Sequence, residues 1–194
     1  MANLVYFDLE TQKLAHEVGG WSNIDRMRLA LAVTYSTERA AYHIYGEQDV
    51  VALVEQLTTA DLIIGFNLNR FDYVVLSPYT STVLWRLPTF DLLERIEQKL
   101  GYRVSLDALA RGTLNESKSA DGVQSVKWWR QGQIDKVTEY CKKDVEITRR
   151  LYEHGCDEGY LRFIDRYGRL RQVQTGGWRS QLRSLLGNNP DRVR

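Results

Sequence analysis

Short apolar runs and period-two alternation predict strands at the start of the chain. Residues 4–9 form an apolar run rich in aromatic side chains, and apolar and polar positions alternate over residues 27–37 and 39–45. The link between the second and third of these segments is short. We therefore predict that they pair as an antiparallel hairpin, which gives three strands with the first segment.

Helical spacing and short apolar runs alternate through the middle of the chain. Val50, Val51, Val54 and Leu57, for example, fall on one face of a helix. The predicted elements are a helix over 47–58, a strand over 61–66, a helix over 67–76 ended by Pro78, a strand over 87–93 leading into a helix that reaches Leu100, and a helix over 106–111 capped by Ser105. This order indicates β-α-β units and a mixed sheet with helices on its faces, and thus an α/β protein.

The longest predicted helix covers residues 135–154, where apolar side chains recur at helical spacing. His154 and Gly155 are typical stop signals, so we expect the helix to end there. A polar loop over 115–122 and a helical turn over 126–130 precede it. A strand over 169–174 and a short helix over 180–186 are expected to follow.

Composition narrows the class of protein. The chain has 194 residues, a formal net charge of +1 and 26% charged residues, as expected for one globular domain with a core of its own. No apolar run approaches membrane-spanning length and no secretory signal is present, so we expect a cytoplasmic protein without a membrane partner. Cys141 and Cys156 lie outside any zinc-binding pattern.

Two acids end the first predicted strand. Asp8 and Glu10 are two residues apart, so their side chains lie on one face of the strand and repel each other. A divalent cation with a preference for oxygen ligands, such as Mg2+, would compensate this repulsion. The alternative is a solvated strand end that leads into a loop.

Further acids follow later in the chain. Asp72 falls in the first turns of a predicted helix, close to the end of a strand. Tyr140 and Asp144 are four residues apart on the longest helix and share a face. A carboxylate on that apolar stripe is costly to bury unless it is paired or binds a metal. Taken singly, Asp144 could be an exposed helix charge and Tyr140 a core aromatic.

Together these residues resemble the three motifs of the DEDDy branch of the DnaQ-like 3'-5' exonucleases. The motifs are Phe7-Asp8-Leu9-Glu10-Thr11, Asn67-x3-Phe71-Asp72 and Tyr140-x3-Asp144. The related branch has a histidine where this chain has Glu139. The likeness runs from about residue 4 to 151. This segment is also similar to the exonuclease domains of family B polymerases and to stand-alone bacterial domains of this kind.

The resemblance implies a ribonuclease-H-like fold with a five-stranded mixed sheet whose first three strands are antiparallel. It implies two divalent ions, Mg2+ or Mn2+, held by the four carboxylates, with Tyr140 orienting the attacking water. It also implies that the backbone near Leu9 and Thr11, with Asn67 and Phe71, contacts the terminal nucleotide. Phe71 is equally compatible with core packing.

The arginines gather toward the end of the chain. Residues 1–160 are expected to form the exonuclease domain, and residues 161–194 an extension of it with eight arginines that would contact phosphates or form a solvated tail. The predicted partner is the 3' end of a single-stranded nucleic acid, with DNA preferred slightly and an RNA-directed exoribonuclease as an alternative. The alternatives are an idle binding module of the same fold, and a nuclease that works beside a helicase or polymerase partner.

Overall fold

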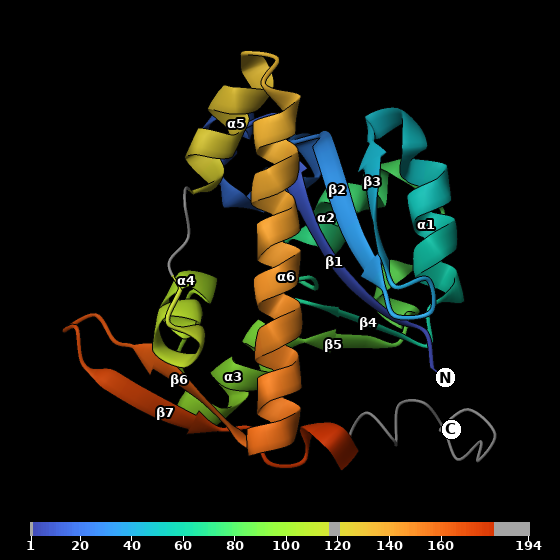
Figure 1. Cartoon of the computed structure of the whole chain (residues 1–194). Coiled ribbons are helices and arrows are strands. Elements are labelled where there is room, and N and C mark those ends of the chain that lie inside the picture. The colour runs from blue at the N-terminus through green and yellow to red at the C-terminus, as the bar shows by residue number, and fades with distance from the viewer. Residues whose placement is uncertain (1, 117–120, 181–194) are drawn as a thin grey trace.

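A five-stranded mixed sheet forms the centre of the structure, a computed structural model that describes residues 2–116 and 121–180 (Figure 1). Its strands are β1 (Leu4–Thr11), β2 (Leu29–Ser36), β3 (Ala41–Gly46), β4 (Leu62–Gly65) and β5 (Thr89–Asp91), in the spatial order β3-β2-β1-β4-β5. The first three strands are antiparallel, whereas β4 is parallel to β1 and β5 to β4. The predicted fold class is confirmed.

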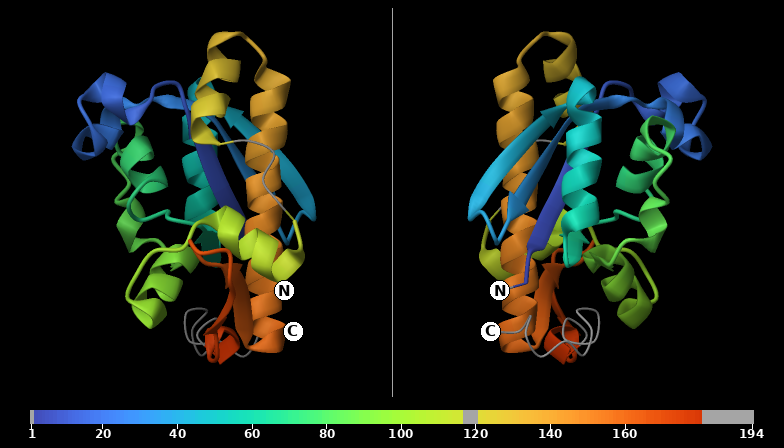
Figure 2. Two further views of the ribbon diagram at one scale, coloured as in Figure 1. Left: turned by 90° about the vertical axis from the view of Figure 1, so that its left-hand side faces the viewer. Right: turned by 90° about the vertical axis from the view of Figure 1, so that its right-hand side faces the viewer.

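The two faces of the sheet support separate hydrophobic clusters. Val5, Phe7 and Leu9 of β1 pack with α1 (Val50–Thr59) and α2 (Asp72–Leu76) on one face. Tyr6 lies on the other face, in the cluster that contains the apolar side of α6 (Ile134–Glu158). Figures 1 and 2 show α6 on one side of the sheet and α1 and α2 on the opposite side. Because β1 is central and buried on both faces, its ends are the places where polar side chains can reach solvent.

The sequence predicts that the longest helix ends at Gly155, and this prediction was wrong. The helix continues to Glu158, and Gly159 ends it in the left-handed conformation with φ +77°. A Cβ on Gly155 would lie 2.6 Å from a ring atom of Trp178, so this glycine admits the tryptophan against the helix. Trp178 is buried and stacks on Tyr152. The glycine therefore reflects side-chain packing rather than a helix end.

Other boundaries also differ from the prediction. The helix predicted over 67–76 begins only at Asp72, because Asn67 has a left-handed backbone with φ +73° and Phe71, directly before the helix, has a non-helical φ of −131°. The described residues also contain the 3-10 segments Ala15–Val18, Trp21–Arg26, Glu47–Asp49, Ser77–Tyr79 and Leu84–Arg86, together with α3 (Leu92–Leu100), α4 (Leu106–Leu109), the π-helical turn Ala110–Leu114 and α5 (Gly122–Arg130). Ser105 caps α4 as predicted, since its Oγ accepts the Ala108 N–H.

A second, two-stranded sheet follows α6. Its strands β6 (Tyr160–Ile164) and β7 (Leu170–Gln174) pair as an antiparallel hairpin. The sequence prediction included β7 but missed β6, whose Leu161 and Phe163 are buried on either side of exposed Arg162. The hairpin packs by these side chains on the cluster around α6. The predicted helix over 180–186 falls almost wholly outside the described residues, as do the last three arginines.

Among the described residues, no helix is both long and apolar enough to cross a membrane.

Candidate metal centre

The alternation of β1 brings Asp8 and Glu10 to the face that α6 covers. Tyr6, two residues earlier on the same face, is buried in the apolar cluster, so the carboxylates begin where that cluster ends. Glu10 is 7% exposed, and Asp8 is half-buried. The pairing of β1 with β2 shifts register between Glu10 and Thr11. Irregularities of this kind are common beside functional sites because they redirect side chains.

Asp72 approaches the carboxylates of β1 from the edge of that strand that pairs with β4. It is the first residue of α2, which follows the turn after β4, the parallel neighbour of β1. Its Oδ1 accepts the Leu9 N–H at 3.2 Å. The carboxyl is 2% exposed. Burial raises the pKa of Asp72 well above its usual range, and the negative charges of Asp8 and Asp91 raise it further.

Helix α6 supplies the remaining predicted residues. Asp144 and Tyr140 lie one turn apart and are 5% and 6% exposed. Burial raises the pKa of the Tyr140 phenol, and the charges of Asp144, Glu10 and Asp8 raise it further. The phenol is protonated at neutral pH.

The predicted metal ligands and nucleotide contacts line one cavity of about 860 Å3. It is lined by every predicted metal ligand and every predicted nucleotide contact: Asp8, Glu10, Asp72, Asp144, Leu9, Thr11, Asn67 and Phe71. Tyr140 is not among the residues that line this cavity. The ligand set is made of carboxylates, which suit hard dications. Burial is the main cause of the raised pKa of Asp72, and the negative charge of Asp8 in the same lining adds to it. The residues present therefore fit Mg2+ or Mn2+.

Cys141 is a neighbour of the site that the sequence interpretation did not include. Within the described residues, ligand atoms of Asp8, Glu10 and Cys141 lie within 4.8 Å of one another. The thiol donates to the Asp8 carboxylate at 3.4 Å. Burial, together with the charge of Asp8, raises the pKa of Cys141. A protonated thiol is a poor metal ligand, so Cys141 acts here as a hydrogen-bond donor that orients Asp8.

Asp91 is a second residue that the sequence interpretation missed. It ends β5 and is 3% exposed. Its carboxylate accepts the N–H groups of Asn67 at 2.8 Å, Asn69 at 3.1 Å and Leu93 at 3.1 Å. These bonds hold the turn that contains Asn67 in its left-handed conformation beside the cavity. The sequence placed this acid inside the predicted strand over 87–93 and did not indicate the N–H groups that it binds.

Two tryptophans pack against predicted site residues. Trp21 is 70% exposed, lines the cavity, and has its ring 6.5 Å from that of Phe71. Trp128 is partly buried and contacts the ring of Tyr140 edge-on at 6.3 Å. Trp21 therefore offers an aromatic surface to a ligand, whereas Trp128 packs against the ring of Tyr140.

Comparison with known proteins gives a match over most of the chain. The model of a family described as the RNase_H superfamily matches residues 5–156, a range that begins in β1 and ends in α6. It thus includes the central sheet and all four carboxylates. A search of curated proteins found no match.

Proposed function

The chain belongs to the RNase H superfamily, and on that premise we propose that it is a metal-dependent 3'-5' exonuclease of the DEDDy type. It would release nucleoside 5'-monophosphates from the 3' ends of single-stranded DNA or RNA. One observation carries the proposal: four carboxylates from β1, α2 and α6, separated by up to 136 positions in the sequence, line one cavity. A tyrosine lies one helical turn before the last of them.

Asp8, Glu10, Asp72 and Asp144 would hold the ions. Dications held there would lower the pKa of a bound water molecule and stabilise the oxyanion that leaves when a phosphodiester is cleaved. The protein contributes the placement of these ligands. Asp72 is fixed by the Leu9 amide and Asp8 by the Cys141 thiol, so both carboxylates are oriented before any ligand arrives.

Tyr140 would orient the attacking water. Because burial and nearby carboxylates raise its pKa, the phenol keeps its proton and forms hydrogen bonds instead of removing a proton. Its ring rests against Trp128, which restricts its rotation. We therefore assign Tyr140 a positioning role toward water and no role as a base.

The terminal nucleotide would occupy the part of the cavity near Asn67, Phe71 and Trp21. The Leu9 N–H already donates to Asp72, and the Thr11 hydroxyl donates to the Lys13 carbonyl. Contacts from Leu9 and Thr11 to a nucleotide would therefore depend on their remaining atoms. The Asn67 Oδ1 accepts from Arg103 at 2.7 Å, so a contact from this side chain to a nucleotide would come from its Nδ2.

The test is hydrolysis of a 5'-labelled single strand with Mn2+, with and without EDTA. We expect a ladder that shortens from the 3' end, no reaction in EDTA, and no reaction on a circular strand. Asp144→Asn should abolish the reaction, whereas Asp135→Asn, an exposed change on the same helix, should not. Hydrolysis by Asp144→Asn at the wild-type rate would refute the assignment. Cleavage of the circle would show an endonuclease instead.

A further inference from the structure

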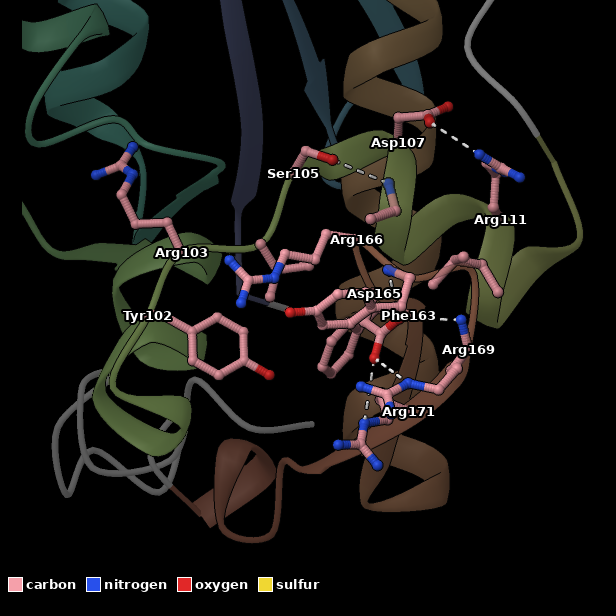
Figure 3. A pocket seen from close by; sticks show the side chains of 14 residues that line it. Tyr102, Arg103, Ser105, Asp107, Arg111, Phe163, Asp165, Arg166, Arg169 and Arg171 are labelled. Carbon is pink, nitrogen blue, oxygen red and sulfur yellow. Dashed lines mark hydrogen bonds and ion pairs between the residues drawn. The ribbon is translucent and has the colours of Figure 1, made fainter.

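A second cavity of about 830 Å3 lies between the β6–β7 hairpin and the segment that contains α4. Figure 3 shows its side chains: Tyr102 and Arg103 come from the approach to α4, whereas Arg166, Arg169 and Arg171 come from the hairpin. We call it the hairpin cavity. Its size is typical of sites that accept ligands, for which volumes of roughly 300–1,000 Å3 are common.

The lining of the hairpin cavity is strongly basic. Five arginines and two aspartates contribute to it, namely Arg103, Arg111, Arg166, Arg169, Arg171, Asp107 and Asp165. Asp165 is shared by Arg169 at 3.0 Å and Arg171 at 3.5 Å, so a single carboxylate faces two guanidinium groups. The nearest approach between Asp107 and Arg111 is 4.0 Å. The cavity therefore keeps an excess of positive charge although the whole chain is close to neutral.

Aromatic rings accompany this charge. Tyr102 and Tyr167 line the cavity and are 51% and 64% exposed. The Arg166 and Arg169 guanidinium groups each lie 4.8 Å from the centre of the Tyr167 ring. Exposed rings beside arginines are the combination that binds single-stranded nucleic acid, because bases stack on the rings while the cations contact phosphates. An acidic peptide would use the charge but not the rings.

The hairpin cavity adjoins the metal centre. Arg103, Val104 and Ser105 line both cavities, so they form the boundary that the two share. Arg103 reaches toward the metal centre, donating to Asn67, and also approaches Glu97 at 3.8 Å. The carboxylates of the metal centre repel a polyanion, so a substrate needs compensating positive charge close by. Here that charge is next to the catalytic cavity.

We infer that the hairpin cavity holds the nucleotides that precede the 3' terminus of a single-stranded substrate. The terminal nucleotide occupies the metal centre, and the strand passes Arg103 into the hairpin cavity. This inference rests on the proposed function for the direction of the strand. It adds a binding site formed by a hairpin that lies outside the residues matched by the family model.

The double variant Arg166→Gln/Arg171→Gln tests the inference. Affinity for a strand of roughly 12 nucleotides is measured by fluorescence anisotropy over a range of salt, with Ca2+ in place of Mg2+. Since each phosphate contact on a single strand contributes about 0.7 to the salt slope, we expect the slope to fall by about 1.4 and affinity at ~0.1 M salt to fall about 25-fold. Arg166→Lys/Arg171→Lys should keep the slope. Arg39→Gln, in the exposed β2–β3 turn, is the matched control.

Hydrolysis of a dinucleotide, which reaches only the metal centre, is measured in parallel. We expect the glutamine variant to match the wild type on this substrate and to have a raised KM on the longer strand. An unchanged salt slope would overturn the inference, and so would equal loss on both substrates or equally tight binding of polyglutamate. If the wild type hydrolyses neither substrate, the proposed function fails, whereas the slope still decides whether the hairpin cavity binds nucleic acid.

Discussion

Replacement of Asp72 by asparagine tests the electrostatic description of the metal centre through protein stability. The amide has nearly the same shape as the carboxylate, and its oxygen can still accept the Leu9 N–H. What the change removes is a negative charge that is 2% exposed and lies near Asp8 and Asp91. Without metal, we therefore expect Asp72→Asn to be more stable than the wild type at neutral pH.

The pH dependence follows from the raised pKa of Asp72. Below its unfolded-state pKa the carboxyl is protonated in both the folded and the unfolded state, so no charge is buried on folding. As pH rises through the folded-state pKa, the native state must accept a buried charge and loses stability. Each unit by which the folded-state pKa is raised lowers the free energy of unfolding of the wild type at high pH by about 1.4 kcal/mol. For a chain of this size that loss lowers Tm by about 3–5 °C. The advantage of Asp72→Asn should therefore appear as pH rises and disappear in acid.

Divalent ions should make the wild type more stable than Asp72→Asn. At a metal concentration of 100 times Kd, binding stabilises the native state by about 2.7 kcal/mol, which raises Tm by about 5–11 °C. The wild type should show this gain, and Asp72→Asn should show less because a ligand is missing. The assay is thermal unfolding followed by circular dichroism from about pH 3.5, below the unfolded-state pKa of aspartate, to about pH 8, in EDTA and in Mn2+. The surface change Asp25→Asn is the control. A variant that melts below the wild type in EDTA at pH 8 would refute the reasoning.

Three further changes test other parts of the account. Tyr140→Phe should keep Mn2+ affinity but slow single-turnover hydrolysis by roughly tenfold or more, and an unchanged rate would remove the phenol from the mechanism. Asp91→Ala leaves several backbone N–H groups without their acceptor, and should lower the free energy of unfolding in urea by roughly 2–4 kcal/mol; a loss below the error of the measurement would contradict the role given to this carboxylate. Gly155→Ala, whose Cβ would lie 2.6 Å from a ring atom of Trp178, should destabilise by about 1–3 kcal/mol despite the better helix propensity of alanine. Gly122→Ala, with open space around it, should not, and equal effects of the two changes would argue against the packing explanation.

The sheet and most helices were predictable because their residues follow simple spacings. Val5, Phe7 and Leu9 alternate with Tyr6, Asp8 and Glu10, and this pattern alone indicates which face of β1 bears the acids. That the acids of β1, α2 and α6 line one cavity followed from the family resemblance rather than from any local pattern.

The errors arose where tertiary packing overrides local preference. Gly155 is a good stop signal, but in the fold it makes room for Trp178, which is 23 positions later in the chain. Asn67 has apolar neighbours at helical spacing, but the Asp91 carboxylate holds its N–H in a left-handed turn. The arginines of the hairpin were expected to contact phosphates, but the cavity that they share with Arg103 was not predictable, since Arg103 and Arg171 line it together only through the packing of the hairpin on the core. In each case the deciding partner lies far away in the sequence.

The central claim is that four carboxylates form one site for two ions. A crystal structure with Mn2+ and a nucleoside 5'-monophosphate, with anomalous scattering to locate the metal, tests it most directly. We predict two peaks about 4 Å apart, with oxygen ligands from Asp8, Glu10, Asp72 and Asp144 and the phosphate between them. A single ion bound by Asp8, Glu10 and the Cys141 thiol, with Asp72 and Asp144 making no contact to metal, would contradict the account.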